Sequence, residues 1–295
     1  MPIRYKHTLP QLMIQCLIYF ILIIIMFVTL YPFLYTFSMS ISDPMRAIAK
    51  QVWLFPKGFS LATYKLAFEN QQIYTAYMNT IIYTVSGTSL NLVLTLMGAY
   101  ALSRKQFFIR DPLMFFIAFT MFFSGGMIPS FLLVTQLGIY NTRWAMILPS
   151  AVNAYNLIIA RTFFSTISDS LEESAKLDGA NDIHIMLRIF IPLSKAIAAV
   201  MVLFYAVGHW NSYFNALLYL PSSKLIPLQL FLFRVVVKNE TAMMMMGIGD
   251  AFERSIATML LKYAVIIVTI LPIICVYPFA QKYFMRGVMI GAIKG

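Results

Sequence analysis

Acidic side chains gather in one short stretch of this chain of 295 residues. Five of its eleven Asp and Glu residues lie between positions 169 and 182, namely Asp169, Glu172, Glu173, Asp178 and Asp182. Catalysis by these carboxylates, for example on a lipid-linked sugar, would need converging histidines or a nucleophile. No histidine partner lies in the other loops on the same predicted face. Charge of this density between apolar segments instead indicates a water-exposed surface that can contact another molecule.

The same stretch has the signals of two short helices joined by a turn. Ser170 and Glu173 have the spacing of a capping box, which predicts that a helix begins there. Gly179 suits the left-handed residue that closes such a helix. A second helix is expected from Asn181 to Phe190, with one apolar face formed by Ile183, Met186, Leu187 and Phe190. This pair of helices could cap the membrane domain passively or dock a partner, and spacing alone leaves both readings open.

Amides and aromatic rings form a second polar group, at positions expected to lie within the bilayer. Side chains of these types bind polar solutes by hydrogen bonds and by stacking on rings, so these residues are candidates to line a substrate path, which would be a sugar path if the substrate is a carbohydrate. The candidates are Asn153, Asn156, Trp210, Asn211, Tyr213 and Asn215. The spacing of Asn211 and Asn215 predicts that they share one helix face, and the same holds for Asn153 and Asn156. Each asparagine could equally hydrogen-bond a neighbouring helix.

The composition is that of an integral membrane protein. Hydrophobic residues make up 60% of the chain and charged residues 11%, and the mean hydropathy is +0.78. A bilayer core about 30 Å thick needs about 20 apolar residues in a helix. Charge-free gaps of that length predict one all-α domain over residues 1–295. Its six spans are expected at about 12–37, 77–102, 112–136, 143–161, 194–219 and 259–282.

The distribution of Lys and Arg predicts the orientation of these spans. A modest excess of basic residues favours both termini and the acidic stretch in the cytoplasm. The first apolar segment is too long for a signal peptide and is expected to be retained in the membrane. The net charge of +11 comes from scattered residues without a basic run. This pattern favours contact with anionic lipid over nucleic acid.

The chain lacks the usual devices for supplying energy by itself. No acidic residue lies in any of the six predicted spans, and only His209 lies near a span interior. A neutral, hydrogen-bonded histidine is favoured there over a proton relay. No phosphate-binding G-x-x-x-x-G-K-[ST] loop is present. Active transport would therefore draw on another subunit, and a stand-alone ion- or proton-coupled carrier is the alternative.

No metal site or cofactor is expected in this chain. The run Met243–Met246 looks at first like a soft metal site, but it lacks interspersed His or Cys. Flexible packing is the favoured role for these methionines.

The acidic stretch closely resembles the EAA loop of ABC-importer permeases. That pattern is E-A-A, then G, then I-x-L-P, and this chain keeps every spacing with Glu173, Gly179 and Pro192 in register. Ser174 replaces the middle alanine, and Ile191 replaces the leucine. The resemblance covers nearly the whole chain. It includes FPKGFSLATYKLAF from 55 to 68, NTIIYT from 79 to 84, AYALSR from 99 to 104, GHWNSYFNALLYL from 208 to 220 and the tail from 281 to 295. These segments are similar to the maltose-type, carbohydrate-uptake branch, and within it to permeases for oligosaccharides, including uronate-containing ones.

The resemblance implies a type I permease fold and a non-catalytic transport subunit. It also implies a second, non-identical permease, two cytoplasmic ATPases that bind ATP and Mg, and an extracellular or periplasmic substrate-binding protein. The location implied is the bacterial cytoplasmic membrane, with lipid around the chain. Residues 165–192 would form the loop that couples to the ATPase. The coupling residues it implies are Glu172, Glu173, Ala175, Leu177, Gly179, Ile189 and Pro192.

Overall fold

A computed structural model describes residues 9–237 and 259–278 of the chain. Within these ranges the elements are helices, and the one isolated strand-type pairing joins Ser42 to Phe59. The predicted all-α class is therefore confirmed for the described residues. The run Met243–Met246 and the tail from 279 lie outside them. The chain divides into two compact units, formed from residues 1–70 with 235–268 and from residues 71–234 with 269–295.

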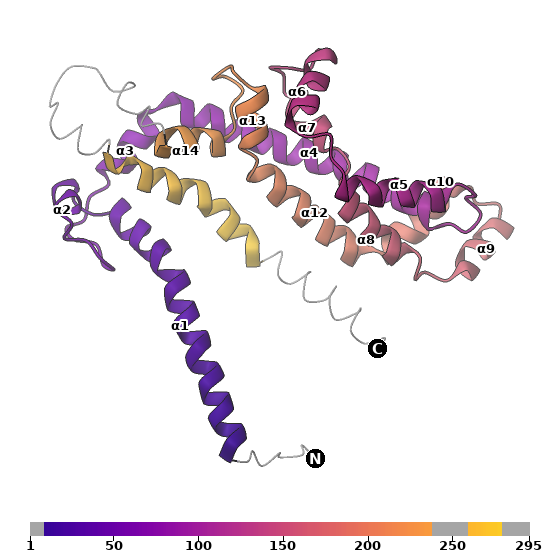
Figure 1. The fold of residues 1–295 in the computed structure, drawn as a ribbon, viewed down its shortest axis with the longest axis horizontal. Helices are drawn as coiled ribbons and strands as arrows, with labels where there is room; N and C mark the ends of the chain where they lie inside the picture. The colour runs from indigo at the N-terminus through magenta and orange to yellow at the C-terminus, as the bar shows by residue number, and fades with distance from the viewer. Residues whose placement is uncertain (1–8, 238–258, 279–295) are drawn as a thin grey trace. The chain divides into compact units, whose positions relative to one another are not determined.

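Three helices in the described ranges are long and apolar enough to cross a membrane. They are α1 (Leu9–Ser40), α4 (Gln71–Ser103) and the helix Met259–Pro278 (Figure 1). They coincide with the spans predicted at 12–37, 77–102 and 259–282, although residues 279–282 lie outside the described ranges. Two bent helix pairs raise the number of candidate spans in the described residues to as many as five.

The other three predicted spans are not single helices. Residues 112–136 divide into α5 (Arg110–Phe122) and α6 (Met127–Gln136), which meet at 116°. The break follows from Gly125 and Gly126, because Gly126 has a φ of 86° that other residues avoid. Residues 143–161 divide into α7 (Trp144–Ile147), η1 (Leu148–Ser150) and α8 (Ala154–Phe164). The count of six crossings remains a prediction.

The span predicted at 194–219 is also broken. Its helix α12 (Lys195–Trp210) ends before a short gap, and α13 (Phe214–Tyr219) follows. Towards the amino terminus, α12 meets the segment Asp182–Leu193 at an angle of 85°. This segment therefore turns sharply away from α12 at the place where the acidic stretch ends.

The smaller unit is built on the end of α1. Two short helices, α2 (Pro44–Ile48) and α3 (Ala62–Glu69), follow it along the chain. Asp43 caps α2 by accepting a hydrogen bond from the backbone N–H of Arg46 at 3.1 Å. The buried core of this unit consists of Met39, Ala47, Val52 and Leu260.

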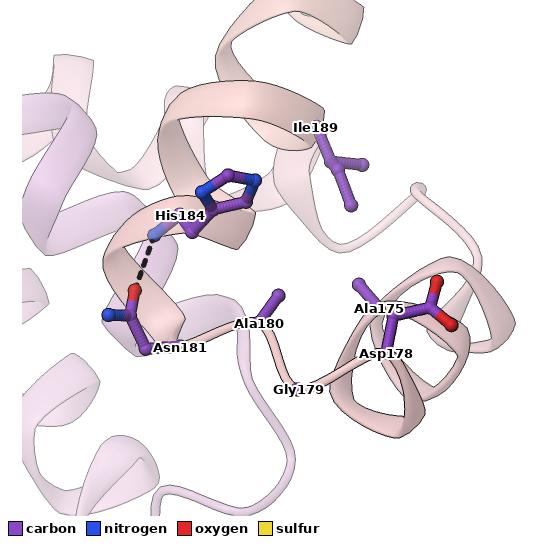
Figure 2. A pocket seen from close by; sticks show the side chains of 7 residues that line it. All are labelled: Ala175, Asp178, Gly179, Ala180, Asn181, His184 and Ile189. Atoms are coloured by element: carbon purple, nitrogen blue, oxygen red, sulfur yellow. Dashed lines mark hydrogen bonds between the residues drawn. The ribbon is translucent and has the colours of Figure 1, made fainter.

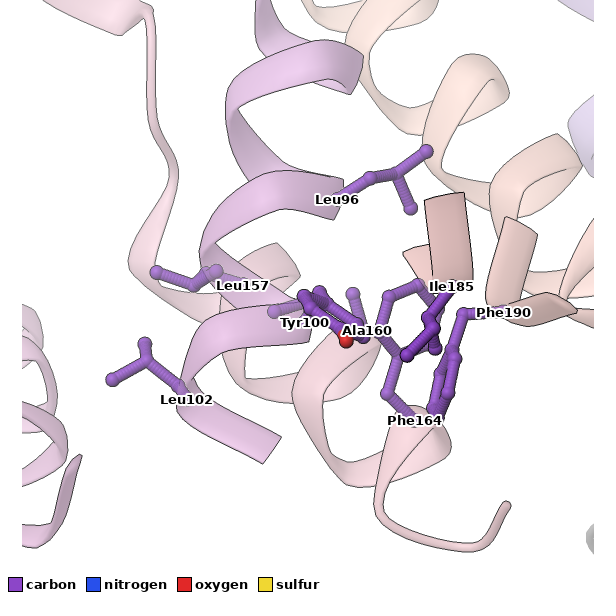
Figure 3. Close-up of a cluster of buried hydrophobic side chains, with 9 residues drawn as sticks. Leu96, Tyr100, Leu102, Leu157, Ala160, Phe164, Ile185 and Phe190 are labelled. Atoms are coloured by element: carbon purple, nitrogen blue, oxygen red, sulfur yellow. The ribbon is translucent and has the colours of Figure 1, made fainter. Parts of the chain in front are cut away.

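The larger unit has its main core where α4, α8 and the segment 182–190 pack together. Figure 3 shows the aromatic centre of this cluster, in which Phe164 and Phe190 are completely buried. The ring centroids of these two residues lie 5.8 Å apart in an edge-to-face arrangement, and Tyr100 meets Phe190 at 5.1 Å. Burial of each phenylalanine contributes about 1.5–3 kcal/mol. The remaining members of the cluster are Leu96, Ala99, Leu102, Leu157, Ala160 and Ile185.

Helix α4 also fixes the approach to α14 (Leu228–Val237). The Asn79 amide donates to the carbonyls of Lys224 and Ile226, at 2.8 and 3.2 Å. The Tyr83 hydroxyl donates to the carbonyl of Leu225 at 2.7 Å. Side chains of the NTIIYT motif therefore bind the backbone carbonyls of the segment that leads into α14. The ten residues of α14 within the described ranges are fewer than a membrane crossing needs.

Candidate coupling site and substrate path

The first helix of the acidic stretch is α9 (Asp169–Leu177), and its cap is Ser168. The extended backbone of Ser168 lets its hydroxyl accept a hydrogen bond from the N–H of Ser170 at 3.4 Å. The prediction that Ser170 caps the helix in a box with Glu173 is therefore wrong. Because Asp169 and Glu172 both lie in the first turn, the helix dipole favours this earlier start.

Gly179 ends α9 in the way that the sequence predicts. Its φ is 80°, in the left-handed region. The N–H of Gly179 donates to the carbonyl of Lys176 at 3.0 Å, and the N–H of Ala180 donates to the carbonyl of Ala175 at 2.9 Å. This pair of bonds is the Schellman motif, which satisfies carbonyls that the helix end leaves open. It gives a sharp, defined turn between the two helices.

The second helix begins as expected but winds differently from the prediction. Asn181 caps α10 (Asp182–Ile185) by accepting from the N–H of His184 at 2.8 Å. A π-helical segment, η2 (Met186–Phe190), and the short α11 (Ile191–Leu193) follow. A π turn places residues i and i+5 on one face. Ile185 and Phe190 are therefore the residues buried against α4 and α8.

The apolar face predicted for this second helix is confirmed at Phe190, which is buried, and at Met186, which packs against the core cluster, but is wrong at Ile183 and Leu187. Ile183 is 66% exposed and Leu187 is 52% exposed. The prediction assumed an unbroken α-helical period, which the π turn interrupts. The side chains of Ile183 and Leu187 therefore face outward and do not pack in the core.

A buried ion pair attaches α9 to the end of α4. The Nη1 atom of Arg104 lies 2.6 Å from Oε2 of Glu172, and both side chains are 8% exposed. The same guanidinium donates to the carbonyl of Phe164 at 3.2 Å and lies 4.3 Å from the ring centroid of Phe190. Arg104 therefore joins α4, α8, α9 and η2 at one point, and a buried cation is stable there because each face has a partner.

Lys176 extends this pair into a small network. Its Nζ lies 2.6 Å from Oε1 of Glu172, 2.8 Å from Oε1 of Gln106 and 3.8 Å from Oδ1 of Asp182. Burial raises the pKa of Glu172, but hydrogen bonds from Lys176 and Arg104 outweigh that effect and hold the pKa below its ordinary value. The hydrogen bond to Glu172 raises the pKa of Lys176. Both groups stay charged at neutral pH.

A pocket of about 460 Å³ lies at the turn between the two helices. Figure 2 shows Ala175 and Ile189 on opposite sides of it, and the ring of His184 beside it. Its other lining residues are Asp178, Gly179, Ala180 and Asn181. The pocket is therefore formed by the turn itself.

The structure assigns different surroundings to the predicted coupling residues. Leu177 is 89% exposed, and Glu173 and Pro192 are also exposed. Ala175 and Ile189 are half-buried against the core cluster. Glu172 is buried and bound within the chain, so it positions α9 and presents no carboxylate to a partner. Sequence reasoning missed its partner Arg104, although this residue ends the AYALSR motif.

The amide and aromatic candidates for the sugar path lie on α8, at the end of α12 and in the segment that follows it. Asn153 caps α8 by accepting from the N–H of Asn156 at 3.0 Å, and Asn156 is buried. The predicted shared helix face of Asn211 and Asn215 is wrong, because α12 ends at Trp210 and Asn215 lies in α13. Asn and Ser side chains compete with helical hydrogen bonds, which accounts for the break at 211–213.

The aromatic members of this group have partners inside the larger unit. The indole N–H of Trp210 donates to the carbonyl of Thr269 at 3.3 Å, and its ring meets Tyr77 edge to face at 5.9 Å. The ring of Tyr213 stacks on Phe233 at 5.4 Å. The Asn211 carbonyl oxygen accepts from Gln229 at 3.2 Å. Tyr213 and Asn211 are nevertheless exposed, so both remain candidates for contact with a substrate.

His209 is hydrogen-bonded within the helices. Its Nε2 lies 2.6 Å from Oδ1 of Asn91, and the amide of Asn91 donates to the carbonyl of Ser150. Gly87 makes room for the ring, since an added Cβ would lie 2.4 Å from it. The contacts fit a neutral imidazole that donates to an amide oxygen.

Comparison with known proteins identifies the group to which this arrangement belongs. Residues 91–290 match the sequence profile of the family described as "Binding-protein-dependent transport system inner membrane component". The chain belongs to this family. An inner membrane component of a transport system should contain membrane-spanning helices, which agrees with the three to five candidate spans among the described residues.

Relatives of this transport component include permeases that are named for carbohydrates. The polygalacturonan/rhamnogalacturonan transport system permease protein YtcP of Bacillus subtilis (strain 168) is 44% identical, over 84% of this chain and 86% of its own length. Protein LplC of the same organism is 42% identical over 83% of both chains. The melibiose/raffinose/stachyose import permease protein MelC is 27% identical over 82% of this chain and 84% of its own length.

A solved structure extends the likeness of this transport component to three dimensions. It is a crystal structure of a bacterial ABC transporter involved in the import of the acidic polysaccharide alginate. The chain matches it with a TM-score of 0.86 and 35% identity, over 94% of this chain and 99% of that one. Membership and fold therefore rest on independent comparisons of sequence and structure.

Proposed function

We propose that this chain is a membrane-spanning subunit of an ATP-driven importer for acidic oligosaccharides, coupled to a separate ATPase through residues 165–192. Family membership, the relatives and the structural match support the importer class. Each relative named for a substrate transports or imports carbohydrate, and family membership argues against the stand-alone ion- or proton-coupled carrier.

One observation carries the coupling proposal. Leu177 lies at the end of α9 with 89% of its surface exposed, while the other end of that helix is held by the buried Arg104–Glu172 pair. Leu177 is thus an exposed apolar side chain beside a rigid turn, where it can bury itself in a partner. The exposed carboxylates of Glu173 and Asp178 lie near it and form an acidic border. Such a surface fits a groove on the ATPase that has an apolar floor and a basic edge.

The substrate class follows from the two likenesses above 30% identity whose names state a substrate. Polygalacturonan and alginate are both built from uronic acids, so their fragments carry carboxylates. The relatives named for neutral sugars are more distant, as MelC shows at 27%. We therefore assign a uronate-containing oligosaccharide, with Trp210, Asn211, Tyr213 and Asn215 as the group to test for contact.

The rest of the assembly is part of the same proposal. A second, non-identical permease, two ATPases that bind ATP and Mg, and an extracellular or periplasmic binding protein complete the importer. Six crossings with both termini in the cytoplasm place residues 165–192 on the side of the ATPase. The assembly would lie in the bacterial cytoplasmic membrane.

Reconstitution of the importer in proteoliposomes tests the coupling surface. Leu177→Ser should reduce ATP-driven uptake at least tenfold and leave the amount of inserted chain unchanged, because this side chain has no packing role within the chain. Leu137→Ser is the matched control, since Leu137 also ends a helix next to a left-handed glycine and is 62% exposed. Normal uptake by Leu177→Ser would contradict the proposed surface.

Competition for uptake tests the substrate separately. Labelled trigalacturonate uptake should be suppressed by unlabelled uronate trimers and not by raffinose. Suppression by raffinose alone would refute the acidic substrate while leaving the importer class intact.

A further inference from the structure

A second pocket, of about 480 Å³, lies where the ends of α4 and α8 meet the start of α5. Three cations line it, Lys105, Arg110 and Arg161, together with the hydroxyl-bearing Ser165 and Thr166. It shares no lining residue with the pocket at the Gly179 turn. The pocket is therefore a separate, positively charged hollow.

The carboxylates near this pocket offset only part of its charge. Asp169 lines it and pairs with Lys105 at 2.6 Å, and Asp111 pairs with Arg110 at 3.1 Å. The side chains of both acids are half or more exposed, at 50% and 72%, so water screens them. Arg161 donates through Nε to the carbonyl of Leu102 at 3.2 Å, which fixes its guanidinium at the pocket wall. No carboxylate among the described residues pairs with it.

The pocket lies at the level where membrane helices end. Helix α4 is a candidate span that stops at Ser103, and α5 begins the bent pair that passes the same test. Phe108 lies between Lys105 and Arg110 and is 88% exposed, and Phe115 on α5 is 67% exposed. Cations next to exposed apolar side chains match the border between lipid headgroups and acyl chains.

We propose that this pocket binds the phosphate headgroup of an anionic phospholipid. Arg110, Arg161 and Lys105 pair with the phosphate, and the acyl chains follow the apolar surface of α5. A guanidinium binds phosphate in a planar, two-point manner, which suits two arginines at one hollow. The lipid would then join the ends of α4, α5 and α8 beside the start of α9.

Lipid retention measures this binding directly. The full-length chain, purified with its associated subunits, is equilibrated in vesicles of equal phosphatidylglycerol and phosphatidylcholine, and native mass spectrometry gives the ratio of the two bound lipids. Arg110→Gln and Arg161→Gln should each lower the preference for phosphatidylglycerol about fivefold, and the double variant about 30-fold. Lys195→Gln is the matched control, because it removes one exposed cation outside the pocket. It should leave the preference unchanged.

Two further arms separate lipid from a soluble anion and binding from misfolding. Inorganic phosphate at 10 mM should not displace phosphatidylglycerol, since it lacks acyl chains; displacement would overturn the lipid assignment. The double variant Arg110→Lys with Arg161→Lys keeps the charge and should retain most of the preference. Equal losses in the pocket variants and in Lys195→Gln, or no loss in either, would also overturn the proposal.

Discussion

The buried pair of Arg104 and Glu172 gives the sharpest prediction, because the loss of stability should differ between the two single substitutions. Glu172→Leu leaves the Arg104 guanidinium buried without its carboxylate, although it keeps the carbonyl of Phe164 and the ring of Phe190. Removing one partner of a buried pair costs about 3–5 kcal/mol. Arg104→Met should cost less, since Lys176 still lies 2.6 Å from Glu172.

Replacing both members should restore much of the loss. Arg104→Met with Glu172→Leu substitutes apolar groups of similar volume, and such replacements of buried pairs are often neutral. The double variant should therefore be more stable than Glu172→Leu alone, which is the reverse of additive behaviour.

Hydrogen exchange in the 168–178 segment measures this local stability in the importer held in nanodiscs. An opening free energy lowered by about 3 kcal/mol speeds exchange roughly 150-fold, or removes protection completely. Asp169→Ala is the control, because it removes an exposed pair and one first-turn charge from the same helix, and it should speed exchange only a few-fold. Equal exchange in Glu172→Leu and Asp169→Ala would refute the role of the buried pair in holding α9.

Three other predictions concern the turn, the pH response and the polar helix contact. Gly179→Ala adds about 1–2 kcal/mol of left-handed strain without a clash, and should uncouple ATP hydrolysis from uptake, whereas Gly138→Ala, equally left-handed and unobstructed, should not. The pKa of Glu172 is held below its ordinary 4.5, so the stability that its carboxylate gives to α9 is complete above about pH 4.5 and is lost as pH falls through the lowered value. Hydrogen exchange of residues 168–178 between pH 3 and 7 should show this loss of stability. Glu172→Gln should abolish the pH dependence. Gly87→Ala should lower the free energy of unfolding by about 1–3 kcal/mol through overpacking against His209, seen as a lower melting temperature, while Gly208→Ala, with open space at its Cβ, should not.

Local signals in the sequence predicted the turn of the coupling site well. Gly179 and Asn181 act through their own backbone conformation and side-chain cap, so their roles follow from residue type. Ser170 misled because Ser168 offers the same hydroxyl before it, and the acidic first turn favours the earlier start. Where two capping residues compete, spacing does not decide between them.

Long-range and non-α features could not be read from spacing. Arg104 and Glu172 are separated by 68 residues, and only packing of α4 against α8 brings them together. The predicted apolar face included Leu187, which is exposed, and left out Ile185, which is buried, because periodicity arguments assume a constant helical repeat and residues 186–190 form a π turn. Hydropathy similarly detected the apolar segments but not the break at Gly126, which depends on a backbone angle.

The central claim is that ATP hydrolysis by a separate subunit moves an acidic oligosaccharide through this chain. The most direct measurement is uptake of labelled trigalacturonate into proteoliposomes that contain the importer and its binding protein. One sample has ATP on the side of the membrane that faces the ATPase, and the other has a pH gradient alone. Uptake is expected with ATP, and no uptake is expected with the gradient alone. Uptake driven by the gradient in vesicles that contain this chain without an ATPase would contradict it.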